Sequence, residues 1–90
     1  MEKVLITVTV SQYTFTYKGV EYIVTLVPLD NGFTDFYIHR KDYGPISLIF
    51  GVDLTQFGFE EESDVDRYVQ SQLHEWVRSY ERDLKKLETT

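Results

Sequence analysis

The 90-residue sequence contains no cysteine and no alanine, and it has only two prolines and five glycines. Without cysteine the fold has no disulfide and no thiolate metal site, so burial of apolar side chains must stabilise it. No apolar run approaches the roughly 18 residues of a membrane-spanning helix. A basic N-terminal segment followed by an apolar stretch and a small-residue cleavage site is also missing. We therefore expect a soluble, cytoplasmic protein that does not contact a membrane.

Basic residues are also scarce. Fifteen Asp and Glu residues against nine Lys and Arg residues give a net charge of −6. A protein that neutralises phosphates by counterion release needs the opposite sign, so direct binding to nucleic acid is not expected. The apolar fraction of 42% is enough for one core, and the length fits a single domain over residues 1–90.

Alternating apolar residues predict strands between about residues 3 and 52. Even-numbered apolar positions up to Val10 give way to odd-numbered positions from Tyr13 onward, so the alternation is reset near Ser11. A bulge within one long strand and a turn between two strands both produce such a reset. We favour a bulge or bend within one strand.

The next two connections read as hairpin turns. Lys18-Gly19 fits a two-residue turn, which pairs Phe15 with Tyr22. Asp30-Asn31-Gly32 fits a three-residue loop with a bulge, and hydrophobic matching then places Phe36 opposite Leu26. Aromatic and aliphatic side chains consequently face one another across both hairpins.

A third turn at residues 42–45 leads into the last predicted strand. Its alternation places four apolar residues on one face, namely Ile46, Leu48, Phe50 and Val52. The acidic connection then covers residues 53–62.

An amphipathic helix is predicted over about residues 64–87. Ser63 and Asp66 resemble a capping box, and apolar residues recur every three or four positions as far as Leu87. At about 1.5 Å per residue this helix is longer than a strand, so the turns from Asp83 onward are expected to overhang the sheet. The predicted fold class is α+β, with an antiparallel sheet of four to five strands followed by one long C-terminal helix packed on one sheet face.

The sheet face opposite the helix is predicted to be partly apolar. Four of its residues are candidates for a second interface, with a partner or with another copy of the chain: Ile23, Val27, Tyr37 and Ile49. Scattered apolar residues are also common on ordinary protein surfaces, so both interpretations stand.

Catalytic motifs are not evident. The two histidines, His39 on a predicted strand and His74 on the polar side of the helix, have no nucleophile or metal-ligand spacing around them. The carboxylates do not follow a calcium-loop pattern, and the glycines do not follow a phosphate-loop pattern. The sequence predicts a protein that is not an enzyme and has no metal and no cofactor.

The charge is concentrated in one stretch. Residues 53–66 contain six acids and no base, whereas the other 76 residues hold nine of each. Acids at a helix N-terminus interact favourably with the helix dipole, which explains the last two acids better than three consecutive glutamates. Alternatively, the stretch is an anionic binding surface with two aromatic anchors. The candidate binding residues are Asp53, Glu60, Glu61, Glu62, Asp64 and Asp66, with Phe57 and Phe59 as anchors.

Two segments carry a resemblance to a known class. The acid-rich run Glu60-Glu61-Glu62-Ser63-Asp64-Val65-Asp66 and the helical segment Glu75-Trp76-Val77-Arg78-Ser79-Tyr80-Glu81 follow short hairpins. In this architecture the sequence resembles small acidic inhibitors encoded by phages and mobile elements, anti-CRISPR proteins among them. The resemblance covers about the last 40 residues. It implies a nucleic-acid mimic in the cytoplasm of a host bacterium, where it blocks the basic nucleic-acid-binding site of a defence protein.

A second class shares the order of strands followed by a helix. The sequence also resembles antitoxins that bind a small toxin, and a regulatory protein-interaction module has the same outline. In that case the open sheet face would be the working surface, in a monomer or a homodimer, and the acids would be incidental.

Overall fold

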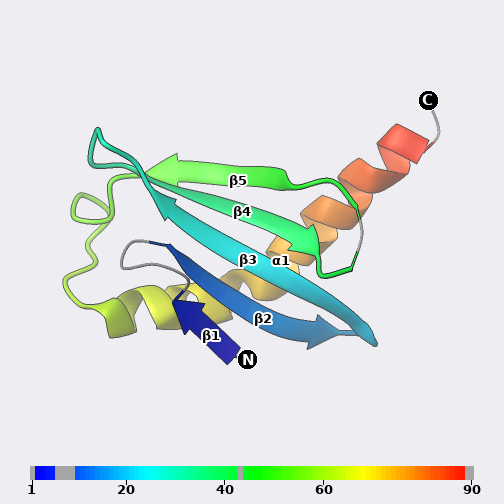
Figure 1. The fold of residues 1–90 in the computed structure, drawn as a ribbon, viewed down its shortest axis with the longest axis horizontal. Helices are drawn as coiled ribbons and strands as arrows, with labels where there is room; N and C mark the ends of the chain where they lie inside the picture. Colours follow the sequence, from blue (N-terminus) through cyan, green and yellow to red (C-terminus); the bar gives the residue numbers. More distant parts are fainter. Residues whose placement is uncertain (1, 6–9, 43, 89–90) are drawn as a thin grey trace.

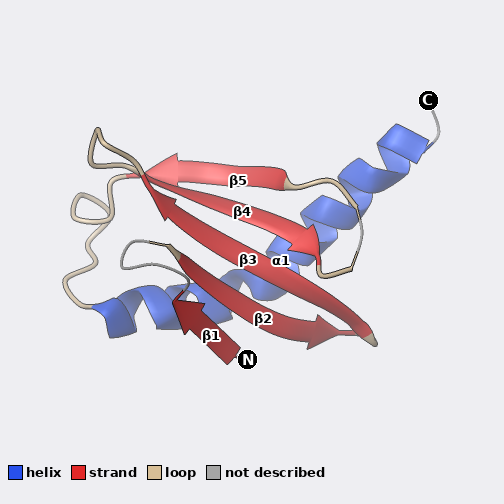
Figure 2. Ribbon diagram, viewed as in Figure 1, coloured by secondary structure: helices blue, strands red, loops and turns tan. Residues whose placement is uncertain are grey.

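The computed structural model describes residues 2–5, 10–42 and 44–88. Five strands form one antiparallel sheet in the order β1-β2-β3-β4-β5, and one helix follows them in the chain. The helix crosses a single face of the sheet diagonally (Figure 1), with all strands in one layer and the helix in the other (Figure 2). The element bounds are β1 Glu2–Leu5, β2 Ser11–Tyr17, β3 Val20–Pro28, β4 Thr34–Arg40, β5 Ser47–Val52 and α1 Glu62–Glu88. The predicted α+β class is confirmed.

Both predicted hairpin registers are confirmed. Phe15 lies opposite Tyr22 across the β2–β3 turn, where Gly19 has a φ of 81°. Phe36 lies opposite Leu26 across the β3–β4 loop. That loop is closed by a hydrogen bond of 2.7 Å from the amide of Leu29 to the carbonyl of Phe33, which leaves three residues between them.

The prediction of one continuous first strand was wrong. β1 ends at Leu5 and pairs antiparallel with β2, with Leu5 opposite Ser11. The chain therefore reverses between two strands, which resets the alternation of side chains as a bulge would. The alternating positions 6–9 on which the prediction depended lie outside the described residues.

The predicted face of β5 was right for Phe50 and Val52, which pack against the core, and wrong for the residues before them. Phe50 lies opposite Phe36, but the pairing shifts by one residue and places Leu48 opposite Tyr37. An inserted residue moves every side chain before it to the other face. As a result Leu48 is 56% exposed on the open side of the sheet, and Ile49 packs against the core that it was predicted to avoid.

The core lies between the sheet and α1. The buried residues from the sheet are Tyr13, Phe15, Tyr22, Val24, Leu26, Phe36 and Ile38, and those from the helix are Val65, Val69, Leu73, Trp76, Val77, Tyr80 and Leu84. The helical stripe ends at Leu84, since Leu87 is 64% exposed, so the overhang is shorter than the one predicted from Asp83. Figure 1 shows these last turns extending past β5. In the described part of the chain, no helix has the length and apolar content needed to cross a membrane.

Candidate protein-binding surface

The acidic segment, residues 53–66, connects β5 to α1 and includes the first turn of the helix (Figure 1). It begins with a turn that Asp53 stabilises. The Oδ1 atom of Asp53 accepts hydrogen bonds from the backbone amides of Thr55 at 3.0 Å and Gln56 at 3.4 Å. Asx turns of this kind satisfy backbone donors locally, so the Asp53 carboxylate stabilises the conformation of the loop.

Asp64 has an equivalent role at the start of α1. Its Oδ2 atom accepts hydrogen bonds of 3.1 Å from the amides of Glu60 and Glu61, and its Oδ1 atom accepts one from Arg67. These hydrogen bonds lower the pKa of the Asp64 carboxyl, with the two backbone amides contributing most. The predicted capping box at Ser63 was wrong, because the helix begins at Glu62 and the acid that reaches back is Asp64.

Asp66 also bonds within the fold. The buried hydroxyl of Tyr13 on β2 donates a hydrogen bond to the Oδ1 atom of Asp66. This contact joins the first turns of α1 to the sheet. Asp53, Asp64 and Asp66 are therefore engaged by the chain itself, and Glu61 also accepts a hydrogen bond of 3.3 Å from the Ser63 hydroxyl.

The three consecutive glutamates have a different environment. Glu60, Glu61 and Glu62 are all exposed, and they line one side of a hollow of about 300 Å³ at the end of the sheet. The rest of the lining is largely apolar and includes Leu54 and Phe59. An exposed row of carboxylates beside an apolar hollow can bind cationic side chains that carry long aliphatic stems.

The two predicted aromatic anchors differ in exposure. Phe57 is 46% exposed, with its ring centroid 5.1 Å from that of Phe59 and 5.3 Å from that of Tyr68. Phe59 is half-buried and packs against the core. Phe57 therefore packs against Phe59 and Tyr68 but remains accessible to a partner. Phe59 mainly attaches the loop to the core.

The open sheet face, opposite α1, is a second candidate surface. Ile23, Val27 and Tyr37 are half-buried there, and Leu48 replaces Ile49 as the apolar residue from β5. The Tyr37 hydroxyl donates a hydrogen bond of 3.0 Å to Asp35, which raises the pKa of the phenol.

The two histidines do not contribute a site. His39 lies on the open sheet face, where burial lowers its pKa, and its Nδ1 atom has no hydrogen-bond partner among the described residues. His74 is exposed and contacts the edge of the Tyr17 ring, with centroids 5.0 Å apart. Within residues 2–5, 10–42 and 44–88, no group of three or more His, Asp or Glu side chains is placed to hold a metal ion.

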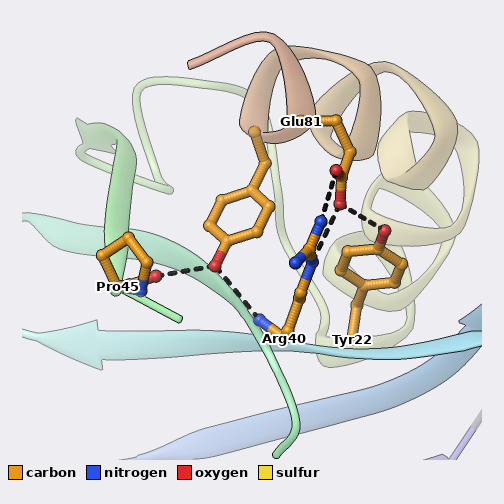
Figure 3. Close-up of polar contacts among 5 residues, drawn as sticks. Tyr22, Arg40, Pro45 and Glu81 are labelled. Carbon is orange, nitrogen blue, oxygen red and sulfur yellow. Dashed lines mark hydrogen bonds and ion pairs between the residues drawn. The ribbon is translucent and has the colours of Figure 1, made fainter. Parts of the chain in front are cut away.

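A polar cluster that no sequence pattern predicted lies toward the other end of the helix. Arg40 on β4 and Tyr22 on β3 both bind the carboxylate of Glu81 on α1 (Figure 3). The hydroxyl of Tyr80 donates a hydrogen bond of 2.8 Å to the carbonyl of Pro45. These partners are 35 to 59 positions apart in the chain, so no local pattern marks them.

Glu81 and Tyr22 affect each other's ionisation. Burial raises the pKa of the Tyr22 phenol to about 12, and the hydrogen bond and charge of Glu81 add to this effect. Burial opposes ionisation of Glu81, but the hydrogen bonds from Arg40 and Tyr22 outweigh it and lower the pKa of that carboxyl. The cluster is an ionised carboxylate held between a guanidinium and a phenol.

Comparisons with known proteins do not name a relative. No protein-family model, no curated protein and no solved structure matched the chain. The geometry of its surfaces is therefore the basis for a functional proposal.

Proposed function

We propose that this protein is a non-enzymatic inhibitor that uses Glu60, Glu61 and Glu62 to block the basic nucleic-acid-binding site of a defence protein. This is the mode of action implied by its resemblance to anti-CRISPR proteins. The observation that supports the proposal is the exposure of all three glutamates along one hollow, in the same connection as the exposed ring of Phe57. Carboxylates that meet Arg or Lys form charge-assisted hydrogen bonds, as phosphates do.

The local fold supports this role because it holds the glutamates in place. Asp53 stabilises the start of the connection, and Asp64 binds the amides of Glu60 and Glu61 at its end. A surface that is ordered before binding loses less conformational entropy in the complex. The backbone that carries Glu60 and Glu61 is therefore ordered before a partner binds.

Helix capping does not account for the three glutamates. Asp64 already accepts the hydrogen bonds of the amides before α1, and adjacent carboxylates repel one another. On an exposed surface this repulsion destabilises the free protein only slightly. In a complex, attraction to the basic side chains of a partner would outweigh it. Phe57 adds an apolar contact of the kind that often dominates binding energy.

The test is competition with nucleic acid. Purified CRISPR effector nucleases, loaded with a fluorescent guide or target duplex, are titrated with the protein while displacement of the duplex is followed by anisotropy. We expect displacement that weakens as salt is raised from about 50 to 300 mM. The triple variant Glu60→Gln, Glu61→Gln, Glu62→Gln should lose at least about tenfold in potency.

A matched control separates local contacts from net charge. Asp30→Asn, Asp42→Asn and Glu75→Gln remove the same three charges from exposed positions outside the acidic segment. This control should displace the duplex as the parent protein does. Equal loss in both triple variants, or no displacement from any effector tested, would contradict the proposal.

A second candidate function uses the open sheet face. In an antitoxin-like or regulatory module, the apolar residues on this face would bind a partner or a second copy of the chain. Leu48 favours this alternative, because a leucine that is 56% exposed opposite half-buried Tyr37 adds to the apolar surface of this face.

A further inference from the structure

A basic groove lies far from the acidic segment along the helix. It runs between the β2–β3 turn and the C-terminal half of α1 and has a volume of about 810 Å³. Its sheet side consists of Tyr17, Val20 and Tyr22. The charged residues that line it are Lys18, Arg78, Glu81, Arg82, Lys85 and Lys86. Five bases and one acid give the groove a positive charge in a protein whose net charge is −6.

The single acid in the groove is already compensated from the sheet side. Arg40, which does not line the groove, donates hydrogen bonds of 3.1 and 2.6 Å to the two carboxylate oxygens of Glu81. The Tyr22 hydroxyl donates another at 2.6 Å. Glu81 is therefore bound chiefly by Arg40 and Tyr22, and Lys85 acts on it more weakly through its charge.

The two arginines of the groove form only weak ion pairs with their neighbours. Arg78 lies 3.2 Å from Glu75 with both side chains about two-thirds exposed, and Arg82 lies 3.9 Å from Asp83. Exposed pairs of this kind contribute between about 0 and 1 kcal/mol. An incoming anion can therefore exchange with them at little cost.

We propose that this groove binds an acidic segment of a partner protein in an extended conformation. Arg78, Arg82 and Lys86 are four residues apart, so they form a row with a spacing of about 6 Å along the helix. Alternate side chains of an extended peptide are about 6.7 Å apart on one face. A peptide with acids at alternate positions therefore matches the row of cations, while Tyr17 and Val20 contact its aliphatic carbons.

The aromatic residues favour a peptide over single-stranded nucleic acid. Binding of nucleic acid strands combines cations with open aromatic faces on which bases stack. In this groove the Tyr17 ring is contacted by His74 at 5.0 Å and by the ammonium of Lys18 at 5.4 Å, and Tyr22 is only 3% exposed. The Lys18 ammonium lies over the Tyr17 ring, and Tyr22 is too buried to stack on a base.

The experiment uses defined peptides and the 90-residue protein. A fluorescein-labelled peptide of alternating Glu and Thr is titrated with the protein at about 50 mM salt and followed by anisotropy. Its counterpart with Gln in place of Glu is the ligand control. We expect saturable binding of the acidic peptide alone, with a loss of about tenfold or more at 300 mM salt.

Paired variants locate the site. Arg78→Gln with Arg82→Gln should weaken binding by about tenfold or more, whereas Lys41→Gln with Arg67→Gln removes the same charge outside the groove and should preserve it. Circular dichroism confirms that each variant is folded. Equal weakening by both pairs, or no saturable binding, overturns the proposal.

Two further measurements test the occupant. If an oligothymidylate binds more tightly than the peptide, the ligand of the groove is nucleic acid and the peptide proposal is wrong. Self-association in sedimentation experiments that disappears in the Arg78→Gln, Arg82→Gln variant would make a second copy the occupant, through its own glutamates. The proposal does not depend on the inhibitor function, because the Glu60, Glu61, Glu62 triple variant should bind the peptide normally.

Discussion

The guanidinium of Arg40 on β4 donates two hydrogen bonds to the carboxylate of Glu81 on α1, one to each oxygen, at 3.1 and 2.6 Å. The side chains are 19% and 31% exposed, so water screens this pair less than the other ion pairs on the helix. Bidentate pairs of this kind fix geometry as well as adding energy. The contact joins the helix to the sheet at the end opposite the acidic segment.

Glu81→Gln should lower the free energy of unfolding by about 1 to 2 kcal/mol, because it leaves Arg40 without its charged partner. The folded protein lowers the pKa of Glu81, so its contribution is present above the ordinary carboxyl pKa and is lost as the pH falls through the folded value. Urea denaturation measures the free energy of unfolding of both proteins at pH 7 and at about pH 3. The difference between the variant and the parent should be smaller at the lower pH. The control Arg78→Gln, which removes an exposed pair, should change stability by less than about 0.5 kcal/mol.

Burial raises the pKa of Tyr22 to about 12, so Tyr22→Phe should remove one tyrosine ionisation near that pH. Folding raises this pKa above the unfolded value of about 10, so the contribution is complete below pH 10 and is lost as the pH rises through 12. Difference absorbance between parent and variant at about 295 nm measures the ionisation. A difference spectrum that titrates near pH 10 would contradict the proposed environment of Tyr22.

The hairpins could be predicted because their signals are local. A turn with glycine at the required position fixes the register, and the register is checked at once by the apolar pairs that it creates, such as Phe15 with Tyr22. β5 lacks this check. Its inserted residue depends on how Phe50 fits against Phe36 and the helix, and this packing is not encoded in neighbouring residues.

The acidic segment was located by counting charges, but counting does not show which acids have partners. Asp53 and Asp64 are short enough to bind amides two to four residues away, and this chemistry could have identified them as turn and capping residues. The hydrogen bond from Tyr13 to Asp66 joins residues 53 positions apart, so no pattern among neighbouring residues predicts it. The same holds for the basic groove, which forms only when α1 lies beside the β2–β3 turn.

Trp76→Ala should lower the free energy of unfolding by about 3 to 5 kcal/mol. The indole is only 7% exposed, and its centroid lies 5.9 Å from that of Phe36 and 6.3 Å from that of Phe50. Leu87→Ala is the matched test of where the buried stripe ends. Because Leu87 is 64% exposed, its removal should cost less than about 0.5 kcal/mol in chemical denaturation. A large loss from Leu87→Ala would mean that the last turn of α1 is packed.

Asp64→Asn should destabilise the start of α1, whereas Ser63→Ala should have little effect, because Asp64 binds the amides of Glu60 and Glu61. The pKa of Asp64 is lowered, so its contribution is present above the ordinary carboxyl pKa and disappears as the pH falls through the folded value. Amide hydrogen exchange at residues 60–64 is the appropriate measurement. Faster exchange in Ser63→Ala than in Asp64→Asn would restore the capping box expected from the sequence.

Leu48→Glu tests whether the open sheet face is an interface. If Leu48, Ile23 and Tyr37 bind a second copy, burying a carboxylate among them should dissociate the dimer, and light scattering should report a halved mass. Ile46→Glu is the matched control, because Ile46 is 66% exposed and precedes β5, so the same charge is added outside the strand. A parent protein that is monomeric at about 100 µM would exclude stable dimerisation and leave a heterologous partner as the remaining occupant of this face. A dimer that persists in both variants would place the interface outside the open sheet face. The basic groove of one copy and Glu60, Glu61 and Glu62 of the other would then be the complementary charged surfaces.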